Sequence, residues 1–103
     1  MEKFTDEIFT IDEIKLRLKP VFDEYRVRKA VLFGSYASNT AGVKSDVDIV
    51  VDSGLRGLSF FGLLDRVVTV LGKDTDLIDV THINQNSPIE KEINETGVLL
   101  YEI

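Results

Sequence analysis

Helical and strand-like segments alternate along this chain, and the alternation restricts its fold more than any other feature. The predicted helices are residues 10–26, a short one within 35–44 that ends in a turn at Gly42, 58–71 and 88–97, and the predicted strands are residues 27–33, 46–52 and 75–81. Residues 99–103 fit an edge strand or a tail. Strands linked by helices predict an α/β (α+β) fold, with a small mixed β-sheet and helices packed against it, and leave open which strands are parallel. With 103 residues, we expect a single domain, residues 1–103.

Local sequence signals mark the starts of two helices. Thr10 and Glu13 have the spacing of a capping box, in which each side chain satisfies a backbone N–H of the other residue. Ser87 and Glu90 repeat that spacing before the last helix. Pro20 lies inside the first helix, and we expect it to kink that helix or divide it in two, because proline lacks a backbone N–H.

The helix predicted over residues 58–71 has apolar side chains around most of its circumference. We therefore expect it to be well buried, with Phe60 and Phe61 in the core and Gly72 at its end. If either phenylalanine proved exposed, it would be a candidate contact for a partner protein.

The composition excludes several kinds of chemistry. The chain has no cysteine, so disulfides and thiolate metal sites are excluded. Its one histidine, His82, argues against a Ser-His-Asp triad or a two-histidine metal site, and we expect it in a surface loop. Any catalysis would then depend on carboxylates, hydroxyls and a bound metal.

Charge and hydropathy restrict the partners and the location. Eighteen Asp and Glu against twelve Lys and Arg give a net charge of −6, the wrong sign for a protein that binds nucleic acid. No apolar run approaches the roughly 18 residues of a membrane span, and the acidic start lacks a secretory signal. We expect a cytoplasmic protein with no membrane partner, and the composition leaves a homo-oligomer open.

Two aspartates interrupt an otherwise apolar strand. On a strand, Asp46 and Asp48 point to the same face with their Cα atoms about 7 Å apart, while Val47 points to the other. Two like charges this close repel each other, and a divalent cation between them removes the cost. Mg²⁺ binds one or two carboxylates together with substrate phosphates, so the pair is a candidate metal clamp. The alternative is a solvated start of the strand.

Gly34 and Ser35 lie where a predicted strand meets a short helix. Glycine allows a ligand to approach the backbone closely, and the turn offers N–H groups and a hydroxyl to a phosphate. The alternative is a plain strand-to-helix turn. Tyr36 fits either stacking on a base or packing within the turn, and we expect Lys44 to be a solvated loop residue.

This arrangement resembles a known family. Gly34-Ser35, ten further residues, Asp46-Val47-Asp48 and a later strand with an aspartate resemble the nucleotidyltransferase superfamily of the DNA polymerase β type. The resemblance is closer to the minimal nucleotidyltransferase (MNT) domains of MntA-like antitoxins in HEPN/MNT toxin–antitoxin systems. It extends from about residue 27 to the C-terminus, and it implies a polymerase β-like nucleotidyltransferase fold.

The resemblance also implies an activity and roles for particular residues. Gly34 and Ser35 would bind the β- and γ-phosphates of ATP. Asp46, Asp48 and a third carboxylate would be the catalytic residues and would hold two Mg²⁺ ions. Family members of the antitoxin type transfer AMP from ATP to a tyrosine of a HEPN toxin, with release of pyrophosphate.

The third carboxylate requires a choice between Asp76 and Asp79. These residues are three apart, so on a regular strand they face opposite sides and only one can join Asp46 and Asp48. The family pattern of an acid at the start of the strand favours Asp76. If three carboxylates converge, we expect at least one of them to have a raised pKa in the metal-free protein.

One departure from the family pattern keeps a second function open. Many relatives carry Arg-Gly where this chain has Ser38-Asn39. We expect Asn39 to take the left-handed backbone conformation of that glycine, which asparagine tolerates. Loss of the arginine removes a donor near the phosphates, so the alternative function is a catalytically impaired module that neutralises a HEPN partner by contact. A transferase acting on antibiotics or RNA ends fits less well, because such relatives carry further domains.

Overall fold

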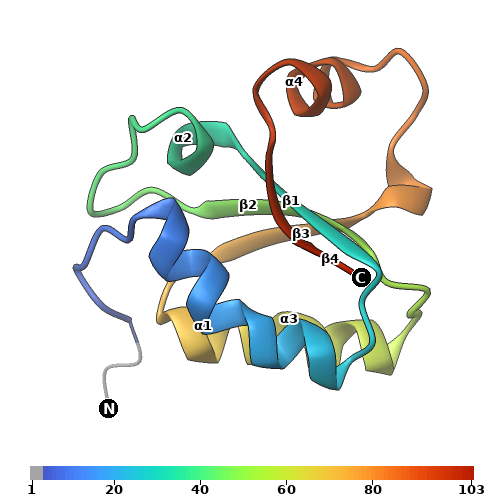
Figure 1. The fold of residues 1–103 in the computed structure, drawn as a ribbon, viewed down its shortest axis with the longest axis horizontal. Coiled ribbons are helices and arrows are strands. Elements are labelled where there is room, and N and C mark those ends of the chain that lie inside the picture. The colour runs from blue at the N-terminus through green and yellow to red at the C-terminus, as the bar shows by residue number, and fades with distance from the viewer. Residues whose placement is uncertain (1–3) are drawn as a thin grey trace.

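The computed structural model describes residues 4–103. Its elements are α1 (Ile11–Glu24), β1 (Lys29–Phe33), α2 (Gly34–Ala37), β2 (Val47–Asp52), α3 (Leu58–Leu71), β3 (Thr75–Asp79), the 3₁₀ helix η1 (Val80–His82), α4 (Pro88–Thr96) and β4 (Val98–Glu102). Figure 1 shows α1 and α3 side by side along one face of the sheet, with α2 and α4 on the other side. None of the helices in this part of the chain is long and apolar enough to cross a membrane.

The sheet is mixed, as predicted. Its strand order is β3-β2-β1-β4, and the chain ends in an edge strand. β1 is antiparallel to both of its neighbours, whereas β2 and β3 are parallel. The register places Asp48 of β2 beside Phe33 of β1 on one side and beside Asp76 of β3 on the other.

The hydrophobic core lies between the sheet and the α1–α3 layer. Its fully buried side chains alternate along β2, where Val47, Ile49 and Val51 are 0% exposed. Such alternation is typical of a strand with one face on a core, so the intervening Asp48 lies on the opposite face. α1 and α3 contribute these buried residues: Ile14, Leu18, Val21, Phe22, Leu63, Val67 and Leu71.

α1 begins as predicted but is not divided. Thr10 and Glu13 form the capping box, with N–H to oxygen distances of 3.1 and 2.8 Å. The helix continues through Pro20, which lies on its exposed face. Proline removes the hydrogen bond to the carbonyl of Leu16, a residue that is 77% exposed, so water can satisfy that carbonyl.

The way in which α1 ends moves the start of the first strand two residues later than predicted. Arg26 adopts the left-handed conformation (φ 55°), and the Val27 N–H donates to the Phe22 carbonyl at 3.0 Å. This is the Schellman closure of a helix, with arginine where glycine is usual. β1 therefore begins at Lys29 rather than at Val27.

Two strand boundaries and one helix cap also differ from the predictions. β2 begins at Val47, so Asp46 lies just before it. β3 ends at Asp79, whose side chain accepts from the Thr81 N–H and starts η1. In α4 only half of the predicted capping box forms: the Ser87 hydroxyl accepts from the Glu90 N–H, but the Glu90 carboxylate accepts from the Asn86 N–H.

The prediction that α3 is buried throughout is wrong at its first turn. Leu58 is 88% exposed and Phe61 is 63% exposed, whereas Phe60 is partly buried against the core. The fully buried residues of α3 are spaced by four, so they occupy one stripe of the helix. Leu64 and Val70 pack against the core beside this stripe, whereas Leu58 and Phe61 are exposed.

Candidate active site

The Gly34 turn lies directly against a carboxylate. Gly34 has φ +74°, and a Cβ atom at this position would be 2.2 Å from Oδ2 of Asp48. A side chain here would therefore both strain the backbone and displace that carboxylate. The fold thus brings together two of the predicted site residues that are 14 positions apart.

The carboxyl group of Asp48 has a pKa well above its ordinary value. It is half-buried on β2, and its pKa is raised to about 6, first by burial and then by repulsion from Asp76, Asp46 and Glu92. Neighbouring negative charges raise the pKa of a carboxyl group because they disfavour its ionised form. The raised pKa of Asp48, with Asp76 and Asp46 among its causes, is what we expect where carboxyl groups lie near one another.

β3 directs its two aspartates to opposite sides. Asp76 is exposed and pairs in register with Asp48 on the neighbouring parallel strand, on the face that carries the Gly34 turn. Asp79 pairs in register with Val51, which is 0% exposed on the core side. The structure therefore places Asp76, and not Asp79, beside Asp48.

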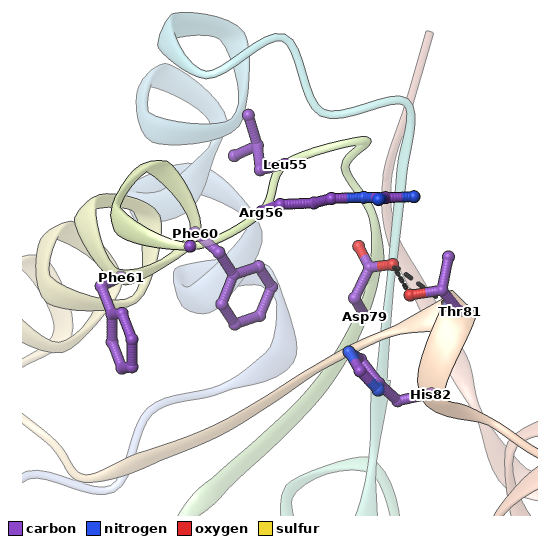
Figure 2. A pocket seen from close by; sticks show the side chains of 8 residues that line it. Leu55, Arg56, Phe60, Phe61, Asp79, Thr81 and His82 are labelled. Atoms are coloured by element: carbon purple, nitrogen blue, oxygen red, sulfur yellow. Dashed lines mark hydrogen bonds between the residues drawn. The ribbon is translucent and has the colours of Figure 1, made fainter.

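Asp79 belongs to a different, fully hydrogen-bonded network. Its carboxylate accepts from the hydroxyl of Ser53 at 2.7 Å, the hydroxyl of Thr81 at 2.8 Å and the backbone N–H groups of both residues. Burial alone would raise the pKa of Asp79, but these four hydrogen bonds outweigh it and lower the pKa. Figure 2 shows the hydrogen bonds to Thr81 at one side of a cavity of about 460 Å³, which Phe60, Phe61 and His82 also line.

Glu92 is a site residue that the sequence did not indicate. The N–H of Gly34 donates to Oε2 of Glu92 at 3.0 Å, across 58 positions of sequence. Glu92 lies on α4, which packs against β1, and its charge adds to the repulsion at Asp48. No motif marks this residue, because only the tertiary packing of α4 brings it to the turn.

The remaining residues of the turn largely follow the predictions. Asn39 has φ 60°, which confirms its left-handed conformation. Tyr36 is 3% exposed within the core cluster, so of its two candidate roles the structure supports packing. Ser35 is half-buried, and its carbonyl accepts from the Thr40 N–H at 2.9 Å. Lys44 and His82 are exposed, as expected.

The donor chemistry of the site fits a hard divalent cation. Asp46, Asp48 and Asp76 offer only carboxylate oxygens, the ligands that Mg²⁺ prefers. The pKa of Asp48 is raised first by burial and then by neighbouring negative charges, and a bound cation would neutralise those charges. Among residues 4–103, no three His, Asp or Glu side chains are already gathered as a metal site. The side chains would therefore have to turn toward one another for all three to bind one group of ions.

Comparison with known proteins gives a family and several relatives. The family model described as "Polymerase beta, Nucleotidyltransferase" matches residues 17–103. Two proteins of Methanocaldococcus jannaschii, each named "Putative protein adenylyltransferase", are similar in sequence. One is 36% identical over 77 residues, covering 72% of this chain and 82% of the relative. The other is 38% identical over 92 residues, covering 84% and 93%.

Solved structures share the fold at low sequence identity. A crystal structure of a toxin–antitoxin with AMP-PNP has a TM-score of 0.73 at 22% identity, covering 86% of this chain and 73% of that one. A structure of a tri-AMPylated Shewanella oneidensis HEPN toxin in complex with MNT antitoxin has a TM-score of 0.68 at 18% identity, covering 91% and 74%. Both likenesses concern the arrangement of helices and strands.

Proposed function

Because this chain belongs to the polymerase beta nucleotidyltransferase family, and is therefore a nucleotidyltransferase, we propose that it transfers AMP from ATP to a tyrosine of a HEPN-domain toxin. Two observations support a protein acceptor: the archaeal relatives carry the name of protein adenylyltransferases, and structures with the same fold include a complex with an AMPylated HEPN toxin.

Each site residue has a proposed role. Gly34 and Ser35 bind the β- and γ-phosphates of ATP, because their turn allows a ligand to approach the backbone. Asp46, Asp48 and Asp76 hold two Mg²⁺ ions, which would supply positive charge to the attacking and leaving oxygens. Asp76 is preferred to Asp79 because it lies beside Asp48, whereas Asp79 is already hydrogen-bonded elsewhere.

The proposed reaction is a substitution at the α-phosphorus of ATP. The tyrosine oxygen forms a bond to that phosphorus, and the bond from the α-phosphorus to the oxygen that bridges the α- and β-phosphates breaks. Pyrophosphate leaves with the electron pair, and the hydroxyl proton passes to a carboxylate, for which Asp76 is the candidate. The products are a tyrosyl-AMP ester and pyrophosphate.

The observation that carries this proposal is the position of Asp48. Its carboxylate lies against the Gly34 turn and in register with Asp76, and its pKa is raised to about 6. A half-buried acid among other acids is costly unless the site binds a cation.

The test uses radiolabelled ATP, Mg²⁺ and a purified HEPN-domain partner. We expect label on the partner with the wild-type chain and a loss of at least about 100-fold in rate with Asp46→Asn or Asp48→Asn. The control is Asp65→Asn, which removes the same charge from an exposed position on α3 and should keep full activity. Equal labelling by the wild type and Asp48→Asn would refute the assigned site.

The second candidate function is neutralisation of the HEPN partner by contact alone. The Ser38-Asn39 departure favours it, because the arginine of many relatives is missing beside the phosphate turn. In the same experiment, a partner that is inhibited but carries no label would support contact inhibition over transfer.

We also propose that residues 1–103 act as one domain, since α1, the sheet and α3 share one hydrophobic cluster. ATP as donor agrees with a cytoplasmic location. Nucleic acid is not a proposed acceptor, because the chain carries a net charge of −6.

A further inference from the structure

We propose that Glu92 holds the place of a nucleotide phosphate at the Gly34 turn and is displaced when ATP binds. The inference rests on the proposed function, because it concerns the same nucleotide site. It makes Glu92 a determinant of nucleotide affinity that the family motif does not include.

In this contact a carboxylate, that of Glu92, accepts a hydrogen bond from a backbone N–H, that of Gly34. Oε2 of Glu92 accepts from the N–H of Gly34 at 3.0 Å, a normal distance for a charge-assisted hydrogen bond. A phosphate oxygen requires the same donor, and one N–H cannot serve both anions well. Binding of a phosphate at this N–H and the Glu92 contact therefore exclude each other.

The surrounding charges favour the same conclusion. Asp48 lies against Gly34 on β2, and its carboxyl group is affected by the negative charges of Asp46, Asp76 and Glu92. A triphosphate that entered with Glu92 in place would meet four carboxylates. Withdrawal of Glu92 removes one of these charges and frees the N–H in a single movement.

α4 is packed in a way that permits this movement. None of its nine residues is buried, in contrast to the buried stripes of α1 and α3. Its end is fixed more tightly, because a Cβ atom on Gly97 would lie 2.8 Å from Cγ1 of Val31 on β1. Segments with few buried contacts move at low cost in free energy, so the side chain of Glu92 or the start of α4 can shift while its end stays on β1.

The test measures nucleotide affinity without an acceptor protein. Titration calorimetry with AMP-PNP and Mg²⁺ compares the wild type with Glu92→Ala and Glu92→Gln. We expect Glu92→Ala to lower Kd about fivefold to tenfold, because one hydrogen bond and one charge no longer compete with the nucleotide. Glu92→Gln should tighten binding less, since its amide oxygen still accepts from Gly34. The control, Glu95→Ala, removes a charge from an exposed position of the same helix and should leave Kd unchanged.

The outcomes separate this inference from the function on which it rests. Tighter binding by Glu92→Ala, with an unchanged Kd for Glu95→Ala, supports the displacement of Glu92. If the wild type binds AMP-PNP but Glu92→Ala binds equally or more weakly, Glu92 does not compete with nucleotide, and only this inference fails. If Glu95→Ala lowered Kd equally, the effect would come from the change in net charge and not from the Glu92 contact, and the inference would be overturned. If none of the proteins binds AMP-PNP, both the inference and the proposed nucleotidyl transfer fail.

Discussion

Gly34 shows how a single residue can decide whether the site forms. Its φ of +74° and the distance of 2.2 Å from a built Cβ atom to Oδ2 of Asp48 leave no room for a side chain. We expect Gly34→Ala to destabilise the fold by about 1–3 kcal/mol, because it combines backbone strain with a steric clash, and to abolish transfer. Gly42→Ala is the matched control, since nothing lies within 4 Å of its Cβ position. Denaturant unfolding of both variants checks the prediction, and equal stabilities would contradict it.

Asp48 should make the stability of the metal-free protein depend on pH. The pKa of its carboxyl group is about 6 in the folded state, against an ordinary value of 3.8. The folded state therefore binds the proton more tightly than the unfolded state, and stability falls as pH rises from about 4 to about 6. Asn cannot ionise, so Asp48→Asn removes this loss. After allowance for solvent screening, we expect the variant to be more stable by about 1 kcal/mol at pH 7.5.

Thermal unfolding in EDTA measures this effect. The difference in Tm between Asp48→Asn and the wild type should be present at pH 7.5, where about 1 kcal/mol corresponds to about 4–8 °C, and should vanish at pH 3.5. If the variant were no more stable than the wild type at pH 7.5, ionised Asp48 would carry no free-energy cost in the folded state, and the prediction would be wrong.

At the scale of the element, side chains of β3 alternate between the two faces of the sheet. This alternation puts Asp76 on the face of the candidate site and Asp79 on the core side, so we expect one to matter for activity and the other for stability. Asp76 is exposed beside Asp48, and Asp79 is 5% exposed and accepts four hydrogen bonds. We expect Asp76→Asn to abolish transfer while changing stability by less than about 0.5 kcal/mol. Asp79→Ala should destabilise the fold by about 2–3 kcal/mol, because it leaves the Ser53 and Thr81 donors unsatisfied.

Activity and unfolding are measured on Asp76→Asn, on Asp79→Ala and on the more conservative Asp79→Asn. Retention of transfer by Asp76→Asn, together with its loss in a folded Asp79→Asn, would reverse the assignment of the third carboxylate.

The ends of elements were predictable where the signal is local and not where it depends on the fold. The capping box of Thr10 and the left-handed Gly72 at the end of α3 involve neighbouring residues, and both formed as expected. The closure of α1 uses Arg26, a residue with no preference for the left-handed region, so no local signal marks it. The cap of η1 by Asp79 was missed because the same segment continues the strand pattern.

At the scale of the whole molecule, the site joins segments that the sequence separates. A spaced motif predicts that Gly34 and Asp48 belong to one site, and the sheet order places Asp76 beside Asp48. Glu92 could not be predicted, because its contact with Gly34 depends on how α4 packs on β1. The parallel pairing of β2 with β3 likewise depends on how the strands assemble, and no pattern within either strand determines it.

The whole molecule should also respond to Mg²⁺. A cation that binds only the folded state raises the free energy of unfolding, by about 1.4 kcal/mol at ten times its Kd. We expect millimolar Mg²⁺ to raise the Tm of the wild type at pH 7.5 by several degrees and to leave that of the Asp46→Asn/Asp48→Asn double variant unchanged. The absence of a shift, with and without ATP, would contradict the proposed metal ligands.

The acids of this site lie at an open surface: Asp46 and Asp76 are exposed, and Asp48 is only half-buried. If the proposed transfer is correct, this openness would let a tyrosine on a folded partner approach the nucleotide, and it would equally leave the nucleotide open to attack by water. A docked acceptor would then cover the open side of the site and exclude water from the nucleotide. Its binding would both suppress ATP hydrolysis and supply the hydroxyl group that attacks in place of water.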